Sequence, residues 1–413
     1  MNIIDVEGAK KPIFNWASQL EAQAVDQMRV IAKLPFVEHC ALMPDAHLGM
    51  EAPIGSVIAC KDVIVPCFVG SDCGCGMGAL RTNLKKEQFT ESIRNVFHQA
   101  VARSIPTGMA HNNDSRRKSM EDKYGEKIDF LFDKFTPAVK VADKKAFFSQ
   151  VGTLGQGNHF IEVQFDEQDN VWVMVHSGSR NIGKCLCDYF DDIAKKLNEK
   201  WHSKSIVGFL PVDSTEGEEY LKWMNICLRF AFLNREAMMN DVVANLLHYF
   251  PEMVITTKAA VEGVDDLINI HHNYASQEHH FGKNLFVHRK GATLANAKTI
   301  GIIPGSQQTN SFITKGMGNH LSLFSSSHGS GRKMGRKDFN VQYQDKVGEI
   351  EVSMKDKGIV FTPFKKASRG RDEGMYDISE SGGAYKDVIS IMEDQKDLVS
   401  ALVKLFPMIN WKG

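Results

Sequence analysis

Apolar residues recur at helical spacing in one long stretch, YLKWMNICLRFAFLNREAMMNDVVANLLHYF, within residues 215–250. That spacing is typical of a helix with a buried face, and a second helix is predicted over about 181–202. Most other apolar runs are short and interrupted by glycine, which favours strands joined by tight loops. The sequence therefore predicts an α+β fold, with mixed β-sheets, surrounding helices and a helical insertion over about 181–250.

Residues 155–180 predict a β-hairpin. Two runs rich in β-branched and aromatic residues flank the polar stretch DEQDN, which is a turn signal. A turn centred in this stretch places Phe165 opposite Asn170 and His159 opposite His176, and opposed residues share a face with Cβ atoms about 5 Å apart. The two imidazoles then bind one metal ion or two neighbouring ions, or form a buried hydrogen-bonded pair. A shift of the register by one residue would separate their faces.

The chain of 413 residues shows no repeat or low-complexity linker, and we expect a single domain over residues 1–413. The charged segment 111–127 is predicted to be a solvated loop or a helix end. Net charge is −1, which excludes a globally basic nucleic-acid binder, so a polyanion would need a local patch. The first residues lack the pattern of a signal peptide, and a cytoplasmic location is expected.

A glycine-rich loop carries the first candidate chemistry. The stretch VGSDCGCGMGAL places Asp72, Cys73 and Cys75 among four glycines, directly after an apolar run. The eight cysteines form neither a disulfide framework nor zinc-finger spacing, so reduced thiols are expected. Cys75 is then either a metal ligand or a buried structural thiol.

Further candidate groups lie in the second half of the chain. The stretch NIHHNYA holds His271 and His272, and SSSHGSGRKMGR places His328 ahead of Arg332 and Arg336. Imidazole, carboxylate and thiolate are together typical ligands of Mn, Fe, Co or Zn. Glycines and arginines after His328 favour phosphate binding, and a histidine in such a loop is a candidate nucleophile.

These motifs resemble the RtcB family of GTP-dependent RNA ligases. The resemblance runs nearly from end to end, through MPDAHLG, PIGSVIA, DCGCGM, GTLGQGNHFIE, VHSGSR, HHNYA, RKGAT, IPGS, SHGSGR, AYKD and the closing NWKG. It implies an RtcB-like fold and an enzyme of tRNA splicing or RNA repair. The implied reaction joins an RNA 3′-phosphate or 2′,3′-cyclic phosphate to a 5′-hydroxyl, using GTP and two Mn²⁺ ions. An activating protein partner is left open, and no membrane is involved.

The resemblance also implies roles for individual residues. His328 would be the catalytic nucleophile that forms a covalent His–GMP intermediate. Cys75 would bridge two metal ions, one completed by Asp72 and His159, the other by His176 and His272. The implied nucleotide contacts are Asn158, Glu162, Ser311, His328, Gly331, Tyr385 and Lys412, and the implied RNA contacts are Arg180, Arg332 and Arg336. In the hairpin register above, Asn158 and Glu162 point away from His159, whereas the family uses both faces at one site.

Several stretches depart from the family pattern without removing a ligand or the nucleophile. IPGSQQTNSF stands in place of IPGSMG and puts Gln307 and Gln308 close to the nucleotide contacts. These departures indicate a divergent subgroup. Two other functions stay open: a binuclear-metal phosphodiesterase or cyclic-phosphate hydrolase without nucleotidyl transfer, and a non-catalytic RNA-binding protein.

Overall fold

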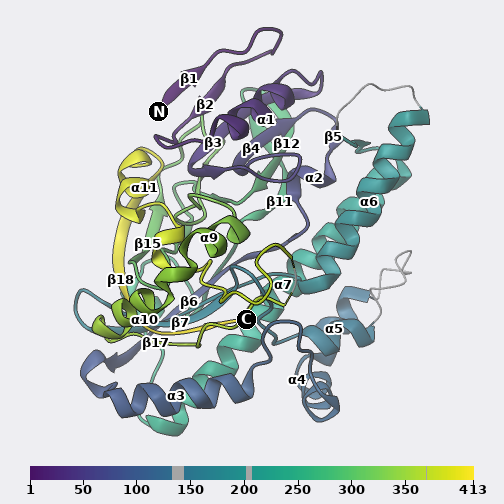
Figure 1. The fold of residues 1–413 in the computed structure, drawn as a ribbon. Helices are drawn as coiled ribbons and strands as arrows, with labels where there is room; N and C mark the ends of the chain where they lie inside the picture. The colour runs from purple at the N-terminus through teal and green to yellow at the C-terminus, as the bar shows by residue number, and fades with distance from the viewer. Residues whose placement is uncertain (133–143, 201–206, 369) are drawn as a thin grey trace.

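Two β-sheets form the centre of the molecule in the computed structural model, which describes residues 1–132, 144–200, 207–368 and 370–413 (Figure 1). The first sheet has the order β1-β2-β3-β4-β12-β11. Its strands are β1 (Asn2–Ile4), β2 (Ile13–Asn15), β3 (Val37–His47), β4 (Ile54–Cys60), β12 (Lys283–Lys290) and β11 (Asn273–His280). Apart from the parallel pair β2 and β3, its neighbouring strands are antiparallel.

The second sheet has the order β10-β6-β8-β7-β18-β15-β14, with β17 paired to β18. Its strands are β10 (Ile268–His271), β6 (Gly76–Lys85), β8 (Asn170–Ser177), β7 (Phe160–Asp166), β18 (Val399–Lys412), β15 (Ser311–Gly316), β14 (Ile300–Ile303) and β17 (Val360–Phe361). Two short ladders join β13 (Ala292–Leu294) to β16 (Ser325–Ser327) and β5 (Val63–Ile64) to β9 (Leu210–Pro211). Mixed sheets with surrounding helices confirm the predicted α+β class.

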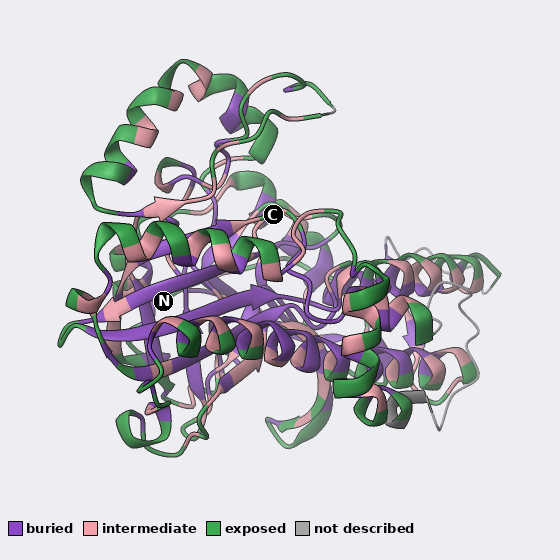
Figure 2. Cartoon of the chain, turned by 90° about the horizontal axis from the view of Figure 1, so that it is seen from below, coloured by how far each residue is buried: buried purple, intermediate pink, exposed green. Residues whose placement is uncertain are grey.

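Helices surround the sheets, and most present an exposed outer face while the strands between them are buried (Figure 2). They are α1 (Ala22–Ala32), α2 (Pro66–Val69), α3 (Glu91–Ser104), α4 (Asp114–Phe132), α5 (Lys144–Gln150), α6 (Arg180–Lys200), α7 (Thr215–Tyr249), α8 (Thr257–Ala260), α9 (Arg336–Tyr343), α10 (Val347–Asp356) and α11 (Val388–Asp394). In the described part of the chain, none of them is long and apolar enough to cross a membrane.

The two predicted helices are confirmed as α6 and α7. Helix α7 begins after Ser214, whose Oγ accepts a hydrogen bond from the Gly217 N–H and so caps the first turn. It packs against β8, β6, α3 and α6, and its apolar face covers the buried strand β8. Residues 201 and 202 of the first predicted helix lie outside the described residues.

The charged segment 111–127 lies mostly within helix α4, so the prediction of a loop or helix end was wrong for most of it. Met120, Tyr124 and Ile128 are buried at four-residue spacing in this helix. They join the core cluster that also contains Trp223 of α7. Three apolar residues on one stripe are enough for docking, although the remaining surface is charged.

The β7–β8 hairpin forms, but its predicted register is wrong by one residue. Phe165 lies opposite Val171 and Phe160 opposite His176. The strands are joined by three residues, and Asp169 adopts a left-handed φ of 61°. Asp166 Oδ1 accepts hydrogen bonds from the N–H groups of Gln168 and Asn170, which stabilises this odd-numbered loop.

The observed register removes the conflict over Glu162. Because Phe160 is opposite His176, Glu162 shares the face of His176. His159 precedes β7 and lies in a loop where Gly155 and Gly157 have positive φ. That loop, and not a strand pairing, brings His159 to His176, with ring centroids 5.3 Å apart.

Candidate active site

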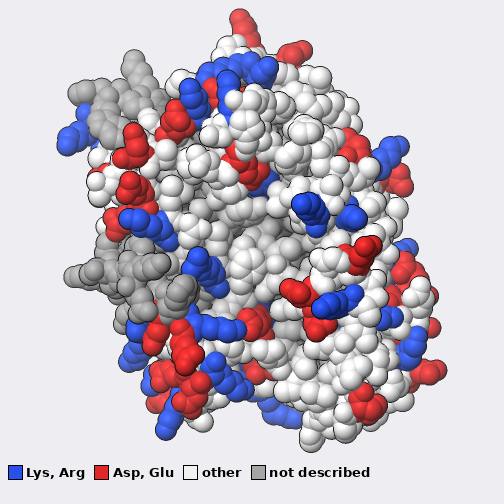
Figure 3. All heavy atoms as spheres, turned by 180° about the vertical axis from the view of Figure 1, so that it is seen from behind, with Lys and Arg blue, Asp and Glu red and all other residues white. Residues whose placement is uncertain are grey.

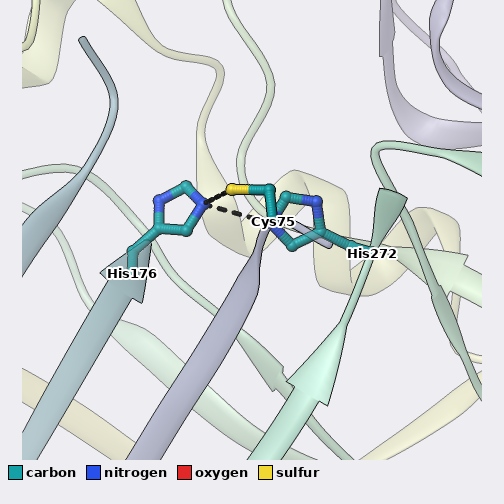
Figure 4. A group of neighbouring side chains, drawn as sticks. All are labelled: Cys75, His176 and His272. Carbon is teal, nitrogen blue, oxygen red and sulfur yellow. Dashed lines mark hydrogen bonds between the residues drawn. The ribbon is translucent and has the colours of Figure 1, made fainter. Parts of the chain in front are cut away.

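Five potential metal ligands from four separate segments converge at one end of the second sheet. Two overlapping groups share Cys75: one adds His176 and His272, the other Asp72 and His159. Cys75 Sγ lies 3.2 Å from His176 Nε2 and 3.3 Å from His159 Nε2, and His159 Nε2 lies 3.0 Å from Asp72 Oδ2. Figure 4 shows Cys75, His176 and His272 pointing toward one another from the ends of neighbouring strands.

A turn holds Asp72 and Cys75 in place. The Cys75 N–H donates to Asp72 O, and Gly74 has a φ of 77°, a conformation that glycine adopts without strain. The Gly74 N–H donates to Asn273 O and the His272 N–H donates to Cys75 O. These backbone bonds tie the turn to the β10–β11 junction, so that His272 faces the thiol.

Two imidazole nitrogens in this cluster are poised to accept a cation. His176 Nδ1 lies 3.0 Å from Asn158 O, and His272 Nδ1 lies 3.4 Å from Asn273 Oδ1. Because these oxygens only accept, each Nδ1 carries the proton and each Nε2 presents a lone pair. The two Nε2 atoms are 3.0 Å apart. Facing lone pairs repel, and a metal ion beside the thiolate would relieve this repulsion, so the donor set fits a metal centre.

Burial sets the protonation of these ligands. It lowers the pKa values of His176 and His272 well below the usual range, which keeps both rings neutral. Burial, followed by Asp72, raises the pKa of the Cys75 thiol. For Asp72, burial acts to raise the pKa, but the neighbouring His159 outweighs it and the pKa falls to about 2.

A buried arginine supports the ligand turn from behind. Arg235 of α7 is fully buried and donates from Nη1 to Gly74 O at 3.0 Å and to Ser177 O at 2.8 Å. Its Nε donates to Asn269 Oδ1 at 2.7 Å, and burial lowers its pKa to about 9. The guanidinium thus links α7 to the turn that carries Asp72 and Cys75, to the end of β8 and, through Asn269, to β10.

We expect Arg235→Ala to lower the free energy of unfolding by about 3 kcal/mol, because it removes three hydrogen bonds that a fully buried guanidinium donates to Gly74 O, Ser177 O and Asn269 Oδ1. Equilibrium denaturation in urea measures this loss. Lys222→Ala is the matched control on the same helix, since Lys222 is exposed and makes only a long ion pair, 4.0 Å, with Glu218. Equal stability of the two variants would contradict a supporting role for Arg235.

His328 lies beside the ligand cluster. It follows β16, which packs against β3, and its Nδ1 is 2.6 Å from Asp45 Oδ2. The backbone N–H of His328 donates a hydrogen bond to the same oxygen, at 3.1 Å. Gly331, with a φ of 69°, lets the loop approach β3, because a Cβ there would lie 2.3 Å from Asp45 O. The rings of His328 and His272 are 4.7 Å apart.

A cavity of about 540 Å³ opens between the sheets in front of His328. Most of the sequence-predicted nucleotide contacts line it: Asn158, Glu162, His328, Gly331, Tyr385 and Lys412. Ser311 instead lies behind the wall, where its Oγ accepts hydrogen bonds from Gln164 Nε2 and the Gly305 N–H. Burial raises the pKa of Glu162 to about 8, against the opposing effects of Gln164 and Lys412.

The three predicted RNA contacts border the same region. Arg332 and Arg336 line the cavity, and a Cβ on Gly157 would lie 3.5 Å from the Arg336 guanidinium. Arg180 packs over Gly155, and its Nη1 is 3.4 Å from His159 Nδ1. The protein face in Figure 3 shows acidic and basic side chains interspersed, which agrees with the net charge of −1.

Asp45, Arg235 and Glu380 are among the ionisable residues of the site that were not identified from the sequence. Asp45 stands in the motif MPDAHLG and is a carboxylate among the apolar residues of a mostly buried strand, a signal that could have marked it. Arg235 is a charged residue on the buried face of a helix. Glu380 lies in a loop whose sequence carries no such signal.

The chain is similar to known proteins over nearly its whole length. A family model described as tRNA-splicing ligase RtcB matches residues 27–413. The chain is 36% identical to the RNA-splicing ligase RtcB of Escherichia coli (strain K12), over 100% of this chain and 99% of that protein. It is 29% identical to the tRNA-splicing ligase RtcB of Methanococcus maripaludis, over 95% of this chain and 92% of the relative. The corresponding protein of Thermococcus kodakarensis is 28% identical, over 95% and 91%.

Proposed function

Because the chain belongs to the RtcB family, we propose that it is an RNA ligase that joins a 3′-phosphate or 2′,3′-cyclic phosphate end to a 5′-hydroxyl end, with GTP as the GMP donor. The observation that carries this proposal is the position of His328, between the carboxylate of Asp45 and the ring of His272, at a cavity lined by cationic side chains. A nucleophile, an orienting acid and anion-binding groups are the parts that nucleotidyl transfer needs.

Asp45 prepares His328 for attack. Its carboxylate lies 2.6 Å from Nδ1, and this negative charge favours the imidazole proton on Nδ1, which leaves the Nε2 lone pair for attack. In the proposed first step His328 Nε2 attacks the α-phosphorus of GTP, a P–N bond forms, and the bond to the leaving pyrophosphate breaks. The P–N bond then breaks as the GMP group passes to an oxygen of the RNA 3′-phosphate, and attack by the 5′-hydroxyl on this activated phosphate expels GMP as the phosphodiester forms. A 2′,3′-cyclic phosphate would first be opened by water to give the 3′-phosphate.

The other cavity residues bind and orient the reactants in this proposal. Lys412 and Tyr385 border the nucleotide, while Arg332 and Arg336 face the RNA phosphates. Asp72, Cys75, His159, His176 and His272 would hold two Mn²⁺ ions, as the resemblance to the family implies. When bound, the ions would supply Lewis-acid stabilisation of negative charge on phosphate oxygens.

The function is tested with two RNA oligonucleotides, one ending in a 3′-phosphate and one beginning with a 5′-hydroxyl, incubated with GTP and Mn²⁺. A joined product that requires GTP is expected. A cyclic-phosphate substrate that is only hydrolysed, with no GTP requirement, would instead favour the metal-dependent phosphodiesterase. Binding of RNA without either product would favour a non-catalytic protein.

Glu162 makes guanosine binding dependent on pH in this proposal. Guanine offers two adjacent donors, N1–H and the 2-amino group, which an ionised carboxylate accepts. With its pKa near 8, Glu162 is mostly protonated at pH 6 to 7 in the free protein, and binding must displace that proton. We therefore expect guanosine affinity to rise with pH, by up to about tenfold per unit, and to level off above about pH 8.

Calorimetry with guanosine, which has no phosphate to titrate, measures this dependence from pH 6 to 8.5. Adenosine is the matched control ligand, because its N1 acceptor and 6-amino donor suit the protonated acid and predict the opposite slope. Glu162→Gln should bind guanosine weakly and without a slope. A flat profile for the wild type would remove Glu162 from base recognition.

A further inference from the structure

Glu380 lies among three cationic side chains that line the cavity: Arg332, Arg336 and Lys412. Its Oε1 accepts from Arg332 Nη1 at 3.1 Å and from Arg336 Nε at 3.0 Å. Its Oε2 accepts from Lys412 Nζ at 2.9 Å and from the Tyr385 hydroxyl. One mostly buried carboxylate therefore holds three cations and a phenol.

The two carboxylate oxygens divide their partners by proposed role. Oε2 contacts Lys412 and Tyr385, which stand on the nucleotide side, and Oε1 contacts the two arginines, which stand on the RNA side. Burial acts to raise the pKa of Glu380, but Lys412 and the two arginines outweigh it and the pKa falls to about 2. The carboxylate is consequently charged at every pH at which the enzyme would work.

The two arginines differ in how firmly they are held. Arg332 is buried, and it also donates to Ser379 O at 2.8 Å and to Met334 O at 3.1 Å. It lies over the Tyr385 ring, 5.0 Å from its centroid. The side chain of Arg336 is 44% exposed, and Glu380 is its hydrogen-bond partner among the described residues. Arg336 is therefore the cation that an incoming anion can most easily take.

We propose that Glu380 is a positioning residue that occupies the place of an anion in the free protein and yields Arg336 to the RNA phosphate when RNA binds. This inference rests on the proposed ligase function and adds a residue that the family resemblance did not supply. The carboxylate keeps the three cations from repelling one another and holds them in one arrangement. It also competes with phosphate for them, so anions bind more weakly than the bare cations would allow.

Removal of the Glu380 charge should have opposite effects on anion affinity and on turnover. Affinity should rise because the carboxylate no longer competes with the anion, and turnover should fall because the cations are no longer positioned. In Glu380→Gln the anion no longer competes with a carboxylate, so its dissociation constant should fall by about tenfold. The cations lose their common partner, so kcat for ligation should fall by about tenfold or more. A residue that only stabilises the loop would weaken both binding and turnover together with stability.

The experiment uses the full chain loaded with Mn²⁺ and two anionic probes without GTP. Inorganic sulfate tests the cations independently of any RNA function. An oligonucleotide with a 3′-phosphate, compared with the same oligonucleotide ending in a 3′-hydroxyl, isolates the phosphate contact. Asp377→Asn is the matched control, because Asp377 stabilises the same loop through Ser379 and Asn340. Ligation kinetics and thermal melting are measured for each variant.

Tighter sulfate and 3′-phosphate binding with a lower kcat in Glu380→Gln, and no tightening in Asp377→Asn, is the expected result. Unchanged or weaker anion binding in Glu380→Gln overturns the inference. If Glu380→Gln does not fold, Glu380→Asp decides, since its shorter side chain should tighten sulfate binding about threefold, and no tightening overturns the inference. Failure of the wild type to join RNA would overturn the proposed function, while the sulfate measurement would still test Glu380.

Discussion

Replacement of His328 with alanine is expected to abolish both the covalent GMP adduct and RNA joining. The imidazole is the group proposed to form the P–N bond, and alanine leaves no nucleophile at this position beside Asp45. Loss of a covalent nucleophile costs at least about four orders of magnitude in turnover. Intact-mass measurement after incubation with GTP and Mn²⁺ should show a GMP-sized increase for the wild type only.

Asp45→Asn separates orientation of the ring from its nucleophilicity. An amide at this position can donate to Nδ1 and thereby moves the imidazole proton to Nε2, which blocks the attacking lone pair. A decrease of about a hundredfold to ten-thousandfold in the rate of adduct formation is expected, with the site still able to bind GTP. For the His328→Ala variant, a GMP adduct of normal yield would remove His328 from the reaction. A wild-type adduct that maps to another residue would do the same.

Local sequence patterns predicted the parts of the fold that local forces determine. Helices α6 and α7 have long apolar faces, and the helical spacing of their apolar residues can be recognised in the sequence without knowing what they pack against. The apolar positions of α4 are sparse in a charged segment, so that its helical nature depends on docking against α7. The β7–β8 hairpin was predicted, but its register depends on a single left-handed residue, Asp169, in a three-residue loop.

The candidate site also combines features that the local sequence predicts with features that depend on the tertiary fold. Its ligands come from a turn, two strand ends and a loop that are up to 200 residues apart, so spacing alone cannot bring them together. His159 reaches His176 through the glycine loop, although the predicted strand pairing was wrong. Residue types and motif order carried the information about chemistry, whereas supporting groups such as Arg235 and Glu380 become visible only when α7 and the loop before Tyr385 are placed against the site.

Among the proposed metal ligands, Cys75 has the largest expected effect, because both donor groups share its sulfur. Cys75→Ala should weaken binding of both ions by at least about a hundredfold, beyond the loss usual for outer groups that only orient a ligand. Ligation should fall below detection at Mn²⁺ concentrations that saturate the wild type. Metal content after gel filtration and calorimetric titration with Mn²⁺ measure the two quantities.

Cys73→Ala is the matched control for this prediction, because Cys73 is buried two residues earlier in the same turn and belongs to the core cluster of α7. It should cost stability through lost packing and leave the metal content unchanged.

At neutral pH Asp72 is ionised and His176 and His272 are neutral, whereas the raised pKa of Cys75 keeps its thiol protonated. Binding of the ions must therefore release the thiol proton, and the affinity of the wild type should increase with pH between 6 and 8.5. Equal metal binding by Cys75→Ala and the wild type would show that the thiol is not a ligand.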